Sequence, residues 1–255
     1  MMMGPAGRSL AAGPQAVAGN PACIGPGFTA GGGRWNLQTS GVSVAAGFSL
    51  SPGMSAAAGV TYLGRGGIVR RDETGAVTGE YSYGTGSVLA GVSYALAPWL
   101  RAGVSMGTAW ENIDAASGTG IIFAAGLHGE KGGCTAGASV TGIGSAPSWG
   151  GITKDMPTEV HLGGDCSFSD HATLFAGSTL GFSTASSFGG GVRLSASDLS
   201  LSAGYAISPG QDEVSGLFGG LSYIYQSGGT YVVQIAAAQR HELEWPVMAG
   251  IAISF

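Results

Sequence analysis

The densest group of charged side chains lies in one short stretch, with Arg65, Arg70 and Arg71 beside Asp72 and Glu73. A cluster of cations attracts anionic ligands, so these arginines could recruit a ligand carboxylate to an exposed loop. The same run is also typical of a solvated loop whose charges pair locally. We therefore predict carboxylate recruitment by Arg65, Arg70 and Arg71, with the solvated loop as the alternative.

Acid–base chemistry would depend on four histidines, which fall on separate predicted strands or turns: His128, His161, His171 and His241. Some membrane barrels use a histidine and a serine as hydrolase machinery. Serine is so common here that His–Ser pairs carry no information. We therefore predict no enzyme and no catalytic residue.

Cofactor and metal chemistry is not indicated either. Cys23, Cys134 and Cys166 are far apart and have neither CxxC spacing nor a histidine at metal-ligand spacing. They specify no zinc site and no disulfide framework, and Cys23 is a candidate lone thiol. The triple glycines at 31–33 and 189–191 lack the Lys-Ser or Lys-Thr of a phosphate loop. They are better interpreted as bends or as places where side chains must be absent.

The composition excludes several classes of protein. The chain has 49 glycines, 10% charged and 44% apolar residues, whereas average glycine usage is about 7%. Collagen would need glycine at every third position, and a disordered linker would have few apolar residues. The net charge is −5 and no basic stripe is present, so no nucleic-acid partner is expected.

Long uncharged stretches lie between Arg34 and Arg65 and over residues 172–192. A hydropathy scan would flag them as transmembrane helices. Glycines and Pro52 interrupt the first stretch, and each interior glycine costs a helix about 1 kcal/mol and a proline about 3 kcal/mol. Strands are therefore favoured.

Alternation with period two supports strands. One face of residues 88–96 is aliphatic or aromatic, and the same pattern recurs over 100–107, 199–207, 231–237 and 247–255. Each run approaches the roughly 9–11 residues that a tilted strand needs to cross a bilayer. We expect the aliphatic face to meet lipid and the Gly/Ser/Ala face to line a lumen. A soluble sandwich is the alternative, but its polar face would carry more charge.

Turn residues separate these runs, as at Ser51-Pro52-Gly53, Gly132-Gly133 and Ser208-Pro209-Gly210. In lipid every backbone amide must be paired, which requires closure. The prediction is an all-β fold, a transmembrane antiparallel β-barrel of about 12–14 strands.

The last strand alternates over Val247, Ile251, Ile253 and Phe255 and ends on an aromatic residue. This pattern resembles the C-terminal signal that outer-membrane insertion machinery reads. We therefore predict a bacterial outer-membrane location, with membrane lipid and the insertion machinery as partners. Such a location requires a secretory signal, and residues 1–20 contain no uninterrupted apolar run. We interpret this as a late start or a truncated chain.

Three segments carry a resemblance to a known family. Residues 9–25, SLAAGPQAVAGNPACIG, resemble the N-terminal region of FadL-type long-chain fatty acid transporters, whose Asn-Pro-Ala motif belongs to a hatch inside the barrel. Residues 59–81 and 156–163 resemble strand and hairpin elements of related PorV-like and spirochaetal barrels. The resemblance implies a hatch-like N-terminal segment at 1–34 and a barrel at 35–255. The run GPGFTAGGGR at 25–34 departs from the family's full first strand.

The resemblance also implies a function. Hydrophobic molecules such as long-chain fatty acids would be captured at outer loops and released past a hatch formed by Asn20, Pro21 and Ala22. An ordinary Asn-Pro turn is the alternative for that motif. A non-transporting barrel, acting as a secretion-system partner or a surface structural antigen, and a truncated paralogue are the alternatives for the whole chain.

Overall fold

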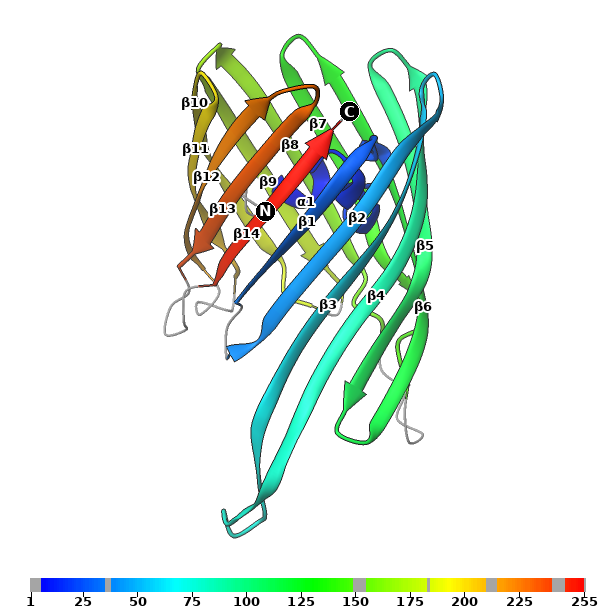
Figure 1. Cartoon of the computed structure of the whole chain (residues 1–255), viewed down its shortest axis with the longest axis vertical. Helices are drawn as coiled ribbons and strands as arrows, with labels where there is room; N and C mark the ends of the chain where they lie inside the picture. The colour runs from blue at the N-terminus through cyan, green and yellow to red at the C-terminus, as the bar shows by residue number, and fades with distance from the viewer. Residues whose placement is uncertain are drawn as a thin grey trace.

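A computed structural model describes residues 6–34, 38–148, 155–182, 184–209, 215–239 and 246–254. In these residues fourteen antiparallel strands form one closed barrel, where each strand pairs with its neighbours in the chain and β1 pairs with β14 (Figure 1). This confirms the predicted all-β barrel at the upper end of the predicted strand number. The strands are β1 Gly27–Arg34, β2 Ser40–Ser51, β3 Met54–Arg71, β4 Val77–Ala97, β5 Leu100–Ile113, β6 Ala116–Lys131, β7 Cys134–Gly144, β8 Glu159–Ser169, β9 Ala172–Gly181, β10 Ser187–Ala196, β11 Leu199–Ile207, β12 Gly216–Gln226, β13 Thr230–Ala238 and β14 Val247–Ser254.

The two ends of the barrel differ in their connections. At one end, here called the short-turn end, tight turns join β2 to β3, β4 to β5 and the later pairs. Gly132 and Gly133 form the turn between β6 and β7 with φ of 62° and 77°, which side chains disfavour. The other end is the long-loop end, and from it the β3–β4 hairpin projects farthest (Figure 1).

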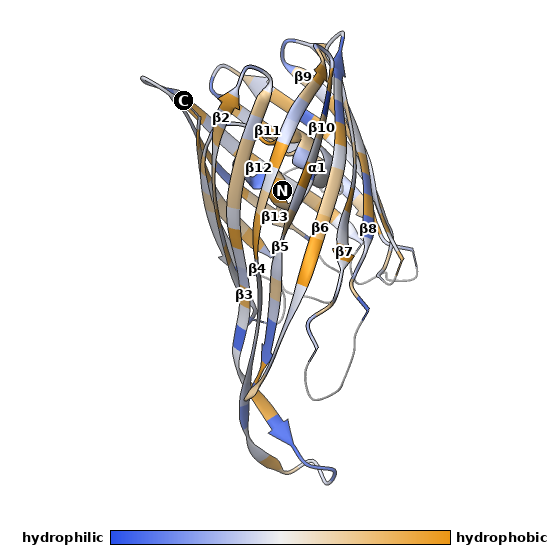
Figure 2. Cartoon of the chain, turned by 90° about the vertical axis from the view of Figure 1, so that its right-hand side faces the viewer, coloured by the Kyte–Doolittle hydropathy of each residue, from blue (hydrophilic) through white to orange (hydrophobic). Residues whose placement is uncertain are grey.

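The two faces of the wall match the predicted alternation. Along β5, Val104 is 56% exposed on the outside, whereas its neighbour Ser105 faces the lumen and is 4% exposed. Leu201 and Ser202 repeat this contrast on β11. Hydrophilic residues stand out on the projecting β3–β4 hairpin (Figure 2). The exterior is therefore an aliphatic band around a lumen lined by small residues.

The first strand is short but complete enough to close the barrel. Its residues pair with β14 from Phe28 opposite Ile253 to Arg34 opposite Val247. We predicted that residues 27–34 belong to the N-terminal segment. Their pairing with β14 and β2 instead makes them part of the wall. Glycine favours this role, because Gly33 carries no Cβ where one would overlap the β14 backbone. Val247 and Ile251 face outward on β14, while Phe255 lies outside the described residues, so the insertion signal stays a prediction.

A disulfide joins Cys134 on β7 to Cys166 on β8. The spacing of these residues indicated no pairing, because 32 positions separate them in sequence. Antiparallel pairing of the two strands places them directly opposite each other, with their Cα atoms 4.1 Å apart. Cys23 is a free and buried thiol, as expected.

Residues 6–26, here called the plug, lie inside the barrel (Figure 1). The plug contains one turn of α-helix and two short 3₁₀ helices, which are α1 Ala6–Leu10, η1 Pro14–Ala18 and η2 Pro21–Cys23. These elements lie against the lumen face of β1 to β9. Among the described residues, no helix has the length and apolar character needed to span a bilayer.

Replacing Val104 by arginine tests whether the aliphatic band contacts lipid. An arginine near the bilayer midplane costs about 2–4 kcal/mol, so Val104→Arg should lower the free energy of unfolding by that amount in lipid vesicles. The matched control is Val77→Arg, because Val77 is 60% exposed on the projecting hairpin. Urea-induced unfolding measures both variants, and equal stability of the two would contradict a lipid-facing band.

Candidate functional site

The plug rests on a wall from which side chains are missing. Where residues 9 and 20–25 cross the inner wall, the strands carry glycine, and an added Cβ would overlap plug atoms or press on them. We call these residues the glycine belt: Gly47 on β2, Gly91 on β4, Gly103 on β5, Gly126 on β6 and Gly137 on β7.

At Gly103 the three atoms nearest to an added Cβ all belong to the plug backbone. A Cβ there would lie 2.5 Å from the amide nitrogen of Ala22 and closer still to the carbonyl group of Pro21. Real Cβ atoms essentially never approach below 3.0 Å. Because backbone atoms cannot swing aside, the plug can occupy this place only while residue 103 is glycine.

Asn20 connects the plug to itself and to the wall. Its side-chain nitrogen donates to the carbonyl oxygens of Ser9, at 2.8 Å, and of Leu127 on β6, at 2.9 Å. Its side-chain oxygen accepts from the amide of Ala22 at 3.1 Å, which caps η2. Asn20 is fully buried, so each of these bonds replaces a bond to water that folding removes. Pro21 begins η2, where a missing amide donor costs little.

Arg101, on β5, reaches from the wall to the end of η2. Its Nε donates to the carbonyl of Ala22 at 3.2 Å, and its Nη2 donates to the carbonyl of Ile24 at 3.2 Å. Nη2 also donates to the hydroxyl of Ser93 at 2.7 Å, and that hydroxyl donates to the Ile24 carbonyl at 2.9 Å. The carbonyls that follow Pro21 are thus held by β4 and β5 together.

An apolar cluster completes the contact between plug and wall. From the plug it contains Ala16, Val17, Cys23 and Ile24, and from the wall it contains Ala57 and Leu89, with Ile122 packed against it. Burial raises the pKa of the Cys23 thiol to about 12, although the nearby Arg101 charge opposes the shift. The thiol therefore stays protonated and unreactive at neutral pH.

A pair of aromatic rings faces the lumen from a different part of the wall. Phe175 on β9 and Phe218 on β12 have ring centroids 6.1 Å apart and are both buried. Leu10, at the end of α1, packs against this aromatic pair. Glycines again make room, because a Cβ on Gly191 would meet the Phe175 ring and one on Gly204 would meet the Phe218 ring. The interpretation of the glycines at 189–191 as places without side chains is confirmed at Gly191.

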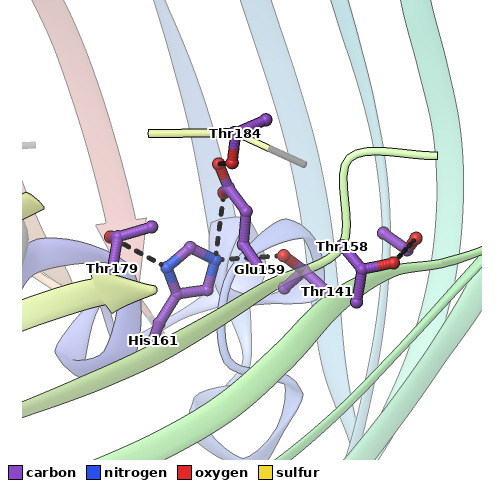
Figure 3. A network of polar contacts seen from close by, with 7 residues as sticks. Thr141, Thr158, Glu159, His161, Thr179 and Thr184 are labelled. Carbon is purple, nitrogen blue, oxygen red and sulfur yellow. Dashed lines mark hydrogen bonds and ion pairs between the residues drawn. The ribbon is translucent and has the colours of Figure 1, made fainter. Parts of the chain in front are cut away.

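His161 is fully buried at the centre of a polar network that joins three strands (Figure 3). Its Nε2 lies 3.0 Å from the hydroxyl of Thr141 on β7, and its Nδ1 lies 3.1 Å from that of Thr179 on β9. Glu159 approaches Nε2 at 3.5 Å and accepts a hydrogen bond from Thr184. Both ring nitrogens thus contact wall residues, which ties β7, β8 and β9 together behind α1.

The other histidines do not build a hydrolase site within the described residues. His171 lies at the β8–β9 turn with its Nδ1 3.1 Å from the Ser195 carbonyl, and His241 lies outside the described residues. Residues 103–107 spell Gly-x-Ser-x-Gly, but Ser105 lies within β5 and its hydroxyl makes no hydrogen bond there. No cluster of potential metal ligands occurs in the described parts of the chain.

The structure does not bring the three predicted recruitment arginines together. Arg70 pairs with Asp114 at 2.5 Å and lies over the Tyr81 ring, while Arg71 donates to the Gly75 carbonyl at 2.8 Å. Hydrogen bonds led by the Thr74 side chain lower the pKa of the exposed Asp72 carboxyl in the same turn. This part of the run has the local pairing that a solvated loop would show.

Arg65 stands apart from that loop. It lines a pocket of about 440 Å³ near the long-loop end, with Val42, Tyr62, Tyr83 and Asn112 among its other lining residues. Its Nε is buried and has no hydrogen-bond partner within the described structure. Of the three predicted arginines, Arg65 is the one that lines this pocket.

Several contributors to the site were missed from the sequence. Arg101, Ser93, Phe175 and Phe218 stand in ordinary alternating strands and belong to no motif. The only available signal was positional, because each falls on the lumen-facing side of its strand.

Comparison with known proteins gives the fold. No protein-family model matches the sequence, and no curated protein matches it. Solved structures do match over nearly the whole chain. The Ralstonia pickettii toluene transporter TbuX is 17% identical with a TM-score of 0.71, covering 98% of this chain and 97% of that one. The Pseudomonas putida toluene transporter TodX is 13% identical with a TM-score of 0.73, covering 98% and 97%.

A third similar structure is the CymD monoaromatic hydrocarbon channel, at 11% identity and a TM-score of 0.72, covering 100% of this chain and 98% of that one. These likenesses confirm the expected closed antiparallel β-barrel at the level of fold. By name, two of these three structures are transporters and one is a channel.

Replacing Asn20 by aspartate tests its role in holding the plug. Aspartate keeps the acceptor for Ala22 but cannot donate, so the buried carbonyls of Ser9 and Leu127 lose their partner. Each unsatisfied group costs about 1–3 kcal/mol, and amides of residues 9–24 should exchange with deuterium on the order of 10- to 100-fold faster. Asn112→Asp, at the exposed rim of β5, is the control. Unchanged exchange of the plug in Asn20→Asp would show that Asn20 does not hold it.

Proposed function

We propose that this protein carries small hydrophobic molecules across the bacterial outer membrane through its lumen, with the plug as the barrier. A closed barrel with an aliphatic exterior has no other stable surroundings than a bilayer. The similar solved structures named above are toluene transporters and a monoaromatic hydrocarbon channel, which supports this class of substrate.

The observation that carries the proposal is the construction of the lumen. A segment of the chain that continues into β1 lies in the lumen, where an apolar cluster and a few polar bonds from Asn20, Arg101 and Ser93 hold it, rather than sheet pairing. Asn20, Pro21 and Ala22 would then act as the hatch. A barrel built only as a structural antigen would have no need for a separate segment held inside its lumen.

The orientation follows from the two ends. Bacterial outer-membrane barrels have short periplasmic turns and longer external loops. The short-turn end would thus face the periplasm and the projecting β3–β4 hairpin would face the exterior. Substrate would enter at the long-loop end and leave past the plug.

Neutral hydrocarbons of monoaromatic size are the substrates that the lumen favours. The aromatic pair is covered by Leu10 of α1 and would offer a π surface to a flat ring once the plug moves aside. Asp165 is the register partner of Phe175, and Arg193 lies 3.9 Å from Asp165. Because Asp165 already pairs with Arg193, the two charges balance and give a ligand carboxylate no net attraction near the aromatic pair, so a neutral solute is preferred there.

Long-chain fatty acids are the second candidate, and one observation favours them. Arg65 lines a pocket near the proposed entrance and has a buried Nε without a partner in the described structure. A ligand carboxylate in this pocket would pair with the Arg65 guanidinium group. In this version Arg65, rather than Arg70 or Arg71, recruits the ligand.

Uptake measurements in cells with the barrel in their outer membrane test the proposal. Labelled toluene and labelled oleate are supplied to wild type, Phe218→Ala and the control Phe168→Ala, in which an exterior phenylalanine is changed. Losing one stacking contact costs about 1 kcal/mol, so saturable toluene uptake by Phe218→Ala should fall about fivefold. Phe168→Ala should behave as wild type.

Each result separates the candidates. Oleate uptake that depends on Arg65, measured in Arg65→Gln, would support the fatty acid version over the hydrocarbon version. If the folded barrel accelerates the uptake of neither compound, the transport proposal fails. The alternatives would then be a non-transporting partner of a secretion system or a truncated paralogue.

A further inference from the structure

Arg101 differs in its partners from Arg70 and from Arg193, the other arginine of the lumen wall whose contacts are described. Arg70 pairs with Asp114, and Arg193 lies 3.9 Å from Asp165, whereas the hydrogen-bond partners of Arg101 are two carbonyl oxygens and a hydroxyl. Within the described residues Arg101 makes no ion pair. Taking a cation partly out of water without a counter-charge is costly. The half-buried guanidinium of Arg101 is thus committed to holding two carbonyls of a segment that is not part of the wall.

The two carbonyls that Arg101 holds lie in the middle of the plug segment that crosses the lumen. From Gly27, at the start of β1, the chain runs back through the lumen and reaches β5 at Ala22 and β6 at Asn20. Asn20 fixes one end of this crossing segment, and the covalent link to β1 fixes the other. Arg101 and Ser93 hold the middle of the span, at the carbonyls of Ala22 and Ile24.

The glycine belt leaves room for the plug but provides no interaction that holds the plug there. Gly91 and Gly103 allow the segment to lie against β4 and β5, yet a bare backbone whose amides are already paired in the sheet offers few further bonds. The guanidinium fork provides directed donors at this point, with a planar geometry that serves two acceptors at once. A lysine ammonium at the same position would donate from a single nitrogen and could not span both carbonyls in the same way.

We propose that Arg101 is the lock of the plug: a positioning residue whose fork holds residues 22–24 in the glycine belt and keeps the lumen closed to small solutes. This inference rests on the proposed function, because a lock matters only if the lumen is a route. It assigns the barrier to one side chain of the wall, oriented by Ser93.

Single-channel recording of the full chain in planar bilayers tests the lock. Wild type should be closed to potassium and chloride for most of the time. Losing two hydrogen bonds from a charged donor should shift the closed-to-open equilibrium of Arg101→Ala on the order of 100-fold or more towards open. Arg101→Lys should fall between the two. The control is Arg193→Ala, which also removes a cation from the lumen wall and should remain closed.

Chemical rescue separates a lock from a general weakening of the barrel. Methylguanidinium added to Arg101→Ala can occupy the vacated place and donate to both carbonyls, so the open probability should fall again. The same addition should leave Arg193→Ala unchanged. Heat-modifiable mobility on gels shows whether each variant is folded, and Arg101→Gln, which is neutral and smaller, serves if Arg101→Ala does not fold.

Two outcomes overturn the lock. One is an Arg101→Ala barrel as closed as wild type, and the other is equal opening in Arg101→Ala and Arg193→Ala. Ion current does not depend on any hydrophobic substrate, so the lock and the transport proposal fail separately. If Arg101→Ala opens the barrel to ions but the barrel takes up no hydrocarbon, the lock proposal stands and the transport proposal fails.

Discussion

The close approach of the plug to the bare backbone of the wall is the constraint on which the rest of this structure depends. Backbone can lie on backbone only where side chains are absent, and the glycine belt crosses β2, β4, β5, β6 and β7 where the plug does. The high glycine content of the chain thus has a specific use. Asn20 and Arg101 can reach their partners because the belt brings plug and wall within hydrogen-bond distance.

The strands of the wall also separate the lipid outside the barrel from the lumen inside it. Alternation sends residues such as Val104 and Leu201 outward and serines such as Ser105 and Ser202 inward. Closure through β1 and β14 pairs the backbone at the seam, which lipid would otherwise leave unsatisfied. The lumen face then needs few large side chains, and the exceptions, such as His161 and the aromatic pair, lie where the plug helix α1 covers them.

Much of this fold could be predicted from sequence, because alternation and turn chemistry are local properties. The barrel and its two faces required only residue types and spacing, whereas the place of Asn20, Pro21 and Ala22 inside the barrel was implied by the resemblance to FadL-type transporters. What could not be predicted depends on register between strands distant in sequence. Cys134 and Cys166 are 32 positions apart and become neighbours only when β7 pairs with β8.

The same limit applies to the site. Arg65, Arg70 and Arg71 are close in sequence, but the hairpin sends Arg70 and Arg71 to its tip and leaves Arg65 at the wall pocket. Arg101 carries no local signal, because its partners lie 77 and 79 residues away. The boundary at residue 34 failed for a related reason, since the many glycines of residues 27–34 indicate a broken strand until pairing with β14 explains them.

Cys23 offers the most direct measurement of the central claim, that the plug seals the lumen and loosens when a hydrophobic solute passes. The chain has three cysteines and two are joined, so Cys23 is its free thiol. Its labelling by a small, membrane-impermeant maleimide is followed in the folded barrel in lipid vesicles, with and without toluene. The account predicts very slow labelling in the absence of toluene, because the thiol is buried with a pKa of about 12, and faster labelling in its presence. Labelling as fast as in the unfolded chain, with no response to toluene, would contradict it.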